Sequence, residues 1–121
     1  MGDLSDHFSR HEFLVDGRPP RSSDPTPPDE LVWRLEALRR RIGRPLPLLS
    51  WRRSPSHNRA VGGARRSWHL RGLAVDVPSG LVTVDEARAV GFRGIGTRGR
   101  WVVHLDIRPG TAVVIFEDRL R

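Results

Sequence analysis

Asp76 is the residue that most constrains how this chain can fold. It lies between Val75 and Val77 in the apolar run LAVDV, which is typical of a buried β-strand. A carboxylate loses its hydration when it is buried, so an ionised Asp76 needs a positive partner beside it. That partner is either an arginine or a metal ion, and the fold must bring one of them to this strand.

Histidines offer the metal alternative. His69 precedes Asp76 in the chain, and Gly72 between them allows a sharp turn after the histidine. His104 and Asp106 are two residues apart, so on a strand their side chains share one face. Two imidazoles and one carboxylate, with a fourth position left to water, are what a catalytic zinc site needs.

Two carboxylates, Asp76 and Asp106, compete for the third ligand position. Arg108 follows Asp106 two residues later, whereas no charged residue adjoins Asp76. We therefore assign Asp76 to the metal and Asp106 to a supporting position beside it or to proton transfer. Spacing alone still favours a simpler interpretation, in which Asp76 pairs with an arginine and the two histidines bind no metal.

The length of 121 residues predicts one domain, 1–121, with an N-terminal segment and proline-rich connector at 1–28 and a core at 29–116. Phe8 and Phe13 are the expected apolar anchors of the N-terminal segment. The absence of cysteine excludes disulfides and thiolate metal ligands. No apolar run approaches about 18 residues, so we expect no membrane span. The N-terminus also lacks a signal-peptide pattern, and no localisation is predicted.

Arginine supplies the basic charge of the chain, because there is no lysine and the formal net charge is +7. One interpretation is a polyanionic partner, such as nucleic acid or an anionic cell wall, and the other is a GC-rich coding sequence. The arginines are scattered, with no recognition helix and no aromatic–basic platform. We therefore predict that nucleic acid is not a partner. The sequence does not predict an oligomeric state.

Capping signals and apolar spacing predict the helices. The main helix is expected to begin with Thr26 as its N-cap and to end at Gly43. A capping box starts a shorter helix over 83–90, and a further short helix is expected around 58–61.

Four strands are expected, over 46–51, 73–77, 101–107 and 112–116, with turns in the glycine-rich segment 91–100. Helices first and strands afterwards predict an α+β fold, with a small, mainly antiparallel sheet and helices packed on one side.

A ten-position motif surrounds the first histidine. S-x-H-x-x-G-x-A-x-D is present as Ser67, His69, Gly72, Ala74 and Asp76. With the blocks SWRRSPSHNRAVGGA before it and GIGTRGRWVVHLDIR after it, the chain resembles zinc D-alanyl-D-alanine peptidases and related peptidoglycan peptidases. The blocks match that family's S-G-Y-R-S-P…N-x-x-V-G-G-A and G-I-G…V-H-x-D-x-R, and the opening DHFSRHEF is similar to one branch. The resemblance covers roughly residues 4–108 and implies the hedgehog/D-Ala-D-Ala-peptidase fold.

The resemblance also implies roles for individual residues. Three of them match the ligands of a Zn²⁺ cofactor: His69, Asp76 and His104. Arg53 matches the arginine that faces the substrate, where a planar guanidinium can grip a carboxylate. In the predicted reaction Arg53 is also a catalytic residue, because it would stabilise the oxyanion. Arg52 departs from the pattern, because an aromatic residue usually precedes that arginine. Ser67 matches a serine near the substrate backbone, and Trp68 beside it is a candidate wall of the cleft.

The position of the general base is the larger departure. Many members carry Glu or Asp three residues before the last zinc histidine, where this chain has Trp101. The branch with an H-x-D motif at that histidine, which this chain resembles through His104 and Asp106, also lacks the acid. Asp106 is the best remaining candidate, although beside His104 it could serve only to orient the imidazole. Glu12 is a weaker alternative, because its segment would have to fold across the site.

The predicted function is metal-assisted hydrolysis of stem or cross-bridge peptides of peptidoglycan, by a carboxypeptidase or endopeptidase of bacterial or phage origin. One alternative is a zinc-containing module that binds cell wall or protein without turnover, because the acid at position 101 is absent. Another is an iron oxygenase, since His104-Leu105-Asp106 has the H-x-D pattern, but no histidine follows residue 104.

Overall fold

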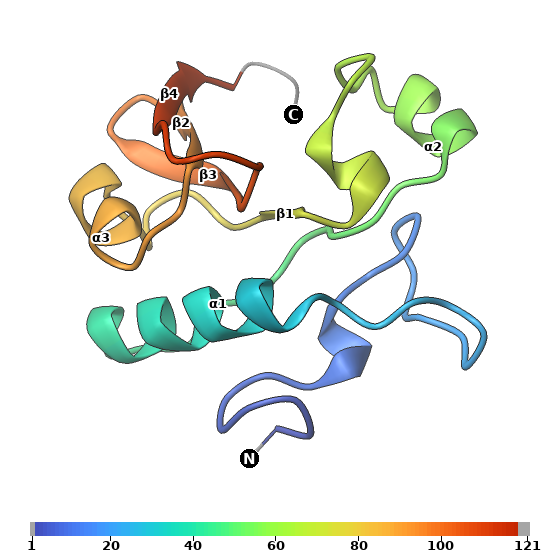
Figure 1. The fold of residues 1–121 in the computed structure, drawn as a ribbon, viewed down its shortest axis with the longest axis horizontal. Coiled ribbons are helices and arrows are strands. Elements are labelled where there is room, and N and C mark those ends of the chain that lie inside the picture. Colours follow the sequence, from blue (N-terminus) through green and yellow to red (C-terminus); the bar gives the residue numbers. More distant parts are fainter. Residues whose placement is uncertain (1, 119–121) are drawn as a thin grey trace.

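The computed structural model of the protein describes residues 2–118 and has an α+β fold (Figure 1). In chain order its elements are η1 (Arg10–Glu12), α1 (Asp29–Ile42), α2 (Pro55–Ala60), η2 (Trp68–Arg71), β1 (Ala74–Asp76), α3 (Val84–Ala89), β2 (Gly94–Arg98), β3 (Trp101–Asp106) and β4 (Val114–Glu117). No helix within the described residues is long and apolar enough to cross a membrane.

The four strands form one sheet in the order β1-β3-β2-β4. Strand β3 is antiparallel to both β1 and β2, and β4 is parallel to β2. The pairing places Asp76 of β1 and Gly96 of β2 opposite His104 of β3, and a bulge follows Gly96. The prediction of a small, mainly antiparallel sheet is confirmed.

Helix α1 packs its leucine face into the core, where Leu31, Leu35 and Leu38 are fully buried, and α3 contacts α1, β2 and β3. Gly43 ends α1 in the left-handed conformation, as predicted. The predicted N-cap, Thr26, is wrong: the N-cap is Pro28 and the helix begins at Asp29. Each residue before a proline is disfavoured in the α conformation, so the two consecutive prolines delay the helix.

The short helices follow their caps. The capping box of Thr83 and Glu86 opens α3, as expected. Helix α2 begins at Pro55, earlier than the expected 58–61, because the Ser54 side chain accepts a hydrogen bond from the His57 N–H and proline suits the first helical position.

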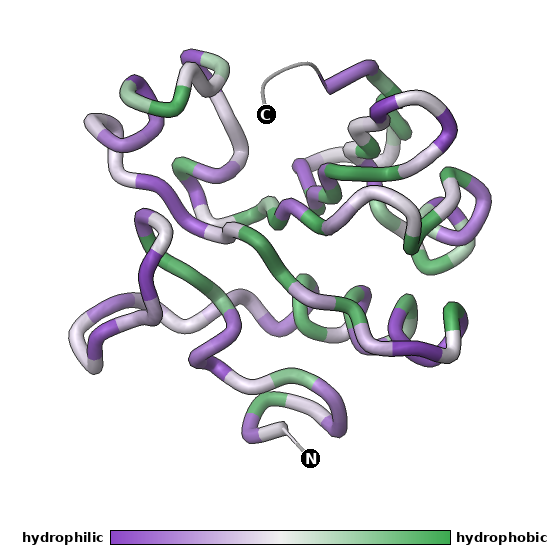
Figure 2. The backbone as a smooth tube through the Cα atoms, turned by 180° about the vertical axis from the view of Figure 1, so that it is seen from behind, coloured by the Kyte–Doolittle hydropathy of each residue, from purple (hydrophilic) through white to green (hydrophobic). Residues whose placement is uncertain are grey.

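The N-terminal segment belongs to the same core as the sheet. Phe8 and Phe13 are buried, as expected, and Phe13 packs edge-on against Trp51 at a ring-centroid distance of 5.9 Å. In Figure 2, hydrophobic stretches run through the middle of the molecule, whereas the outer loops are largely hydrophilic. The boundaries predicted at 1–28 and 29–116 stay a prediction, with apolar side chains from both parts sharing one interior.

Two segments differ from the strand predictions. Segment 46–51 forms no strand and joins β1 only through a single bridge between Ser50 and Asp76, because Pro45 and Pro47 have no N–H to donate to a ladder. The glycine-rich segment expected to form turns instead contains β2, Gly94–Arg98. The sheet therefore has the expected number of strands, but not the expected set.

Candidate metal centre

Three elements bring two histidines and an aspartate together. His69 lies on η2, Asp76 ends β1, and His104 lies opposite Asp76 on β3. All three side chains are buried, and one ligand atom from each lies within 4.8 Å of the others. Gly72 allows this convergence, because it reverses the chain between η2 and β1 with a φ of 70°.

In each imidazole, the nitrogen that points away from Asp76 donates a hydrogen bond. Nδ1 of His69 lies 2.6 Å from the carbonyl oxygen of Trp51, which can only accept. Nε2 of His104 lies 2.8 Å from Oδ2 of Asp106. When both imidazoles are neutral, the inward nitrogens, Nε2 of His69 and Nδ1 of His104, therefore carry lone pairs, and they lie 3.1 and 3.5 Å from Oδ1 of Asp76. Three acceptors that face one another require a cation between them, and this donor set suits a divalent metal.

The second oxygen of Asp76 has its own partners. Oδ2 accepts hydrogen bonds from the Ser50 hydroxyl at 2.6 Å and from Nη2 of Arg53 at 3.2 Å. Burial alone would raise the pKa of Asp76, yet its contacts with His104, His69 and Ser50 hold that pKa far below the ordinary value. The carboxylate is thus held ionised, with Oδ1 directed at the histidines.

The two histidines differ in their electrostatic surroundings. Burial lowers the pKa of His69, which favours the neutral imidazole that a metal needs. Burial acts on His104 in the same direction, but its contacts with Asp106 and Asp76 outweigh it and raise the pKa of His104. When His104 is protonated, its second proton lies on the inward Nδ1, and a metal ion would displace it.

Asp106 is fully buried behind His104 and is surrounded by donors. Besides Nε2 of His104, it accepts hydrogen bonds from the backbone N–H, Nε and Nη2 of Arg108, at 3.0, 2.9 and 2.7 Å. Burial would raise the pKa of Asp106, but Arg108 and His104 hold it well below its usual range. These contacts fit a group that orients the imidazole, which is the supporting role that the sequence left open.

A cavity of about 260 Å³ opens beside the two histidines. Among its lining residues are the three predicted to contact substrate: Arg53, Ser67 and Trp68. The Ser67 hydroxyl also accepts a hydrogen bond from the His69 N–H at 3.2 Å, so it caps η2 as well. A second cavity of about 440 Å³ lies on the Asp76 side, and Arg53 lines both.

Arg53 is the inward-facing arginine of the pair. Its side chain is 6% exposed and bridges Asp76 and Asn58, with Nη1 3.1 Å from the Asn58 side-chain oxygen. The Asn58 amide in turn donates to the carbonyl of Ala64 at 2.9 Å, which fixes the loop that leads to η2. Glu12, the weaker candidate base, lies in η1, where its carboxylate accepts from the Ser9 N–H. It does not line either of these two cavities.

The structure adds three residues to the site that the sequence analysis did not identify. Phe116 and Asp118 come from β4 and the residue after it, and both line the cavity beside His104. Their positions depend on the parallel pairing of β4 with β2, which places Phe116 opposite Gly96. Ser50 is the first serine of the SWRRSP block, so its place in the motif was a usable signal.

A buried His–Asp–His group beside a cavity, on an α+β fold, defines a protein with a site that could hold a metal ion. The comparison with protein families is more specific. Residues 6–106 match the family described as Peptidase M15, and the chain therefore belongs to that family. This is a family of zinc peptidases, so membership confirms the resemblance and the fold class and supports a metallopeptidase. A search of curated proteins found no match to the chain.

Proposed function

We propose that the protein is a zinc metallopeptidase that hydrolyses stem or cross-bridge peptides of peptidoglycan. One observation carries the proposal: one ligand atom from each of two histidines and an aspartate converges with the others, all buried, beside a cavity. In this proposal His69, Asp76 and His104 are the zinc ligands. Bound zinc supplies Lewis-acid chemistry, which polarises a peptide carbonyl and activates water.

The residues around the cavity support binding of a peptide that bears carboxylates. Arg53, Arg66 and Arg108 line it, and Trp68 and Phe116 provide aromatic surface between them. A planar guanidinium binds a carboxylate or a carbonyl through parallel N–H donors. We assign Arg53 and Ser67 to the peptide backbone and Trp68 to a side-chain wall. Peptidoglycan stem peptides combine carboxylates with small apolar side chains, and this lining suits them.

Hydrolysis needs a group that moves a proton. A bond forms from the water oxygen to the carbonyl carbon, the C–N bond breaks, and a carboxylate carries the water proton to the leaving amine. The assignment of Asp106 to this step stays a prediction, and its contacts with His104 and Arg108 favour the orienting role instead. Asp118 is the carboxylate among residues 2–118 that lines the cavity with both histidines, and it is 7% exposed. We therefore place Asp118 beside Asp106 as a candidate base.

A second candidate function is a zinc-containing module that binds cell-wall peptide without turnover. Two observations favour it: Trp101 stands where many relatives have an acid, and Asp106 already accepts hydrogen bonds on both oxygens. The two functions share the metal and differ only in product formation, so cleavage of a defined peptide separates them.

His69→Ala tests the metal centre that both functions need. Loss of one of three ligands should remove bound zinc, because two remaining ligands seldom hold a catalytic metal. We expect about one zinc per wild-type chain by elemental analysis, and close to none in the variant. His11→Ala is the matched control, because His11 is exposed and lies in η1 away from the site. Equal zinc in the two variants would overturn the assignment.

A further inference from the structure

Arg108 binds the Asp106 carboxylate at both of its oxygens. Nε lies 2.9 Å from Oδ1 and Nη2 lies 2.7 Å from Oδ2, so the planar guanidinium forms the two-pronged contact that fixes a carboxylate in orientation. The backbone N–H of Arg108 adds a third hydrogen bond, to Oδ1 at 3.0 Å. Oδ2 is also the atom that accepts from Nε2 of His104. A chain of contacts therefore runs from Arg108 through Asp106 to His104.

The surroundings leave the Asp106 carboxylate little freedom. Asp106 is 0% exposed, and Gly94 lies opposite it on β2. A methyl group on Gly94 would come within 2.0 Å of Oδ2, so the carboxylate fills the space that the glycine leaves. Because the pocket is closed, the direction in which Asp106 accepts is set by the donors around it.

The Arg108 guanidinium lies close to two aromatic rings at the cavity. Its guanidinium carbon lies 5.7 Å from the ring centroid of Trp68 and 5.7 Å from that of Phe116. Phe116 also packs against the His104 imidazole at a centroid distance of 5.4 Å. Both rings therefore help to place the arginine, and the backbone carbonyl of Arg108 accepts a hydrogen bond from the Arg93 side chain.

We propose that Arg108 is a positioning residue that sets the His104 imidazole through Asp106. By holding both oxygens of Asp106, it keeps Oδ2 on the Nε2–H of His104, which leaves Nδ1 as the lone-pair nitrogen facing Asp76. The role deepens the proposed metal centre and rests on it. It does not require turnover, so it can be tested whether or not the protein cleaves peptide.

Arg108→Gln tests the role through zinc affinity, measured by competition with a chromophoric chelator. Loss of the partner that orients a metal-bound histidine typically weakens metal binding by about 10–100-fold, and we expect a loss in that range. Arg71→Gln is the matched control. Arg71 also lies over Trp68, at 5.4 Å, but makes no hydrogen bond to Asp106. A wild-type affinity in Arg108→Gln, or an equal loss in both variants, would overturn the proposal.

A readout on the metal-free protein separates positioning from general destabilisation. Nitrogen-15 NMR of the imidazoles reports which nitrogen carries the proton, and we expect a single Nε2–H form of neutral His104 in the wild type at high pH. Arg108→Gln should mix the two tautomers, whereas Arg71→Gln should not. An unchanged His104 tautomer in Arg108→Gln contradicts the proposal. The NMR measurement uses metal-free protein, so it still tests the role of Arg108 if the wild type binds no zinc. Absence of zinc binding in the wild type would contradict the proposed function and not the role of Arg108.

The double variant Arg108→Gln, Asp106→Asn tests whether Arg108 acts through Asp106. Because Arg108 acts through Asp106, the double variant should bind zinc no more weakly than Asp106→Asn alone. Fully additive losses would show that Arg108 acts by another route. Should Arg108→Gln fail to fold, Arg108→Lys replaces it, since lysine keeps the charge but cannot grip both oxygens. We expect Arg108→Lys to bind zinc more weakly than the wild type, and a wild-type affinity in this variant would count against the two-pronged contact.

Discussion

Three buried aspartates lie around the candidate metal centre, each in different surroundings. Asp76 gives one oxygen to Ser50 and Arg53 and directs the other at the histidines. Asp106 lies behind the His104 imidazole and accepts hydrogen bonds from His104 and Arg108 on its two oxygens. Asp118 lines the cavity itself. Under the proposed function, the three positions would separate three tasks that a hydrolytic site needs: metal ligand, orientation of a ligand, and proton transfer.

Asparagine variants test the last two tasks at the residue scale. We expect Asp118→Asn to keep zinc affinity and to lower turnover by about 10²–10⁴-fold, the usual effect of losing a general base. Asp106→Asn should weaken zinc binding and recover turnover at saturating zinc. Initial rates and chelator competition measure both, with exposed Glu117→Gln on β4 as the control.

The reverse outcome has a clear meaning. If Asp118→Asn turns over like the wild type while Asp106→Asn stays inactive at saturating zinc, Asp106 is the base that the sequence predicts. The sequence could not separate the two aspartates, because Asp118 reaches the cavity only through the pairing of β4 with β2.

Strand β2 shows at the scale of elements why part of the fold escaped prediction. The sequence GIGTR has the glycines of a turn, yet it forms the strand between β3 and β4. Those glycines are needed because Asp106 and His104 lean over β2: added methyl groups would come within 2.0 Å of Asp106 and 2.8 Å of His104. By contrast, the strand carrying Asp76, the His104 strand and α1 have ordinary apolar spacing, and all three were predictable from it.

Gly94→Ala tests the close approach of β2 to the site. The new methyl group would displace the Asp106 carboxylate, so we expect weaker zinc binding and an unfolding free energy lower by about 1–3 kcal/mol. Urea unfolding of the metal-free protein and chelator competition measure the two effects. A variant with wild-type stability and wild-type affinity would show that Asp106 has room to move, against the packing described for it.

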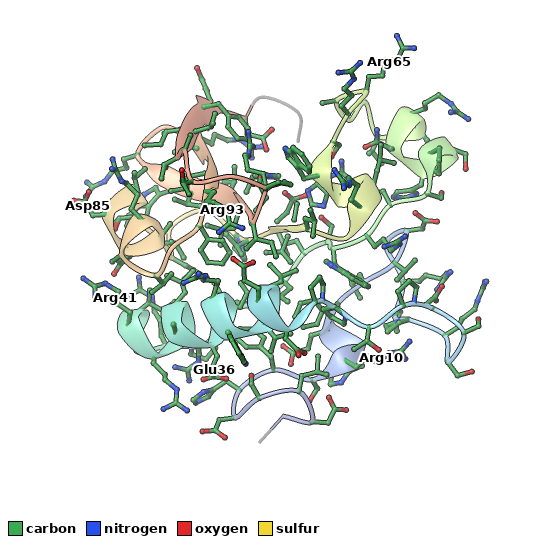
Figure 3. The ribbon with its side chains drawn as sticks, in the orientation of Figure 1. Arg10, Glu36, Arg41, Arg65, Asp85 and Arg93 are labelled. Atoms are coloured by element: carbon green, nitrogen blue, oxygen red, sulfur yellow. The ribbon has the colours of Figure 1, made fainter. Side chains whose placement is uncertain are left out.

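At the scale of the whole molecule, a partly buried carboxylate ties the N-terminal segment to α1. Glu36 of α1 accepts hydrogen bonds from the Ser5 hydroxyl at 2.6 Å and the His7 backbone N–H at 2.8 Å, and it pairs with Arg40 at 3.1 Å. Figure 3 shows Glu36 on the side of α1 that faces the N-terminal loop. The apolar anchors Phe8 and Phe13 were readable from the sequence, but this polar tie was not, because nothing local pairs Glu36 with residues so distant in the chain.

The tie should depend on pH. Burial would raise the pKa of Glu36, but hydrogen bonds from Ser5, His7 and Arg40 outweigh it and lower the pKa from 4.5 to about 2. Because the folded pKa lies below the unfolded one, the stabilisation is complete above pH 4.5 and is lost as the pH falls to about 2. We expect Glu36→Gln to lower stability by about 1–3 kcal/mol at neutral pH and to approach the wild type near the lower limit.

Denaturant unfolding across that pH range measures the difference between the two proteins. Asp85→Asn, on the outer side of α3 and visible in Figure 3, is the control for removing an exposed carboxylate. A constant difference between wild type and Glu36→Gln at every pH would contradict the electrostatic origin of the tie.

The central claim, a zinc-dependent peptidase acting on peptidoglycan peptides, has one direct test. Defined muropeptides are incubated with the purified protein, with the protein after chelation, and with the chelated protein after zinc is restored, and the products are identified by mass spectrometry. We predict cleavage of one peptide bond, its loss on chelation, its return with zinc, and no cleavage by His69→Ala. Intact muropeptides with the zinc-loaded protein, or cleavage that persists without metal, would contradict the account.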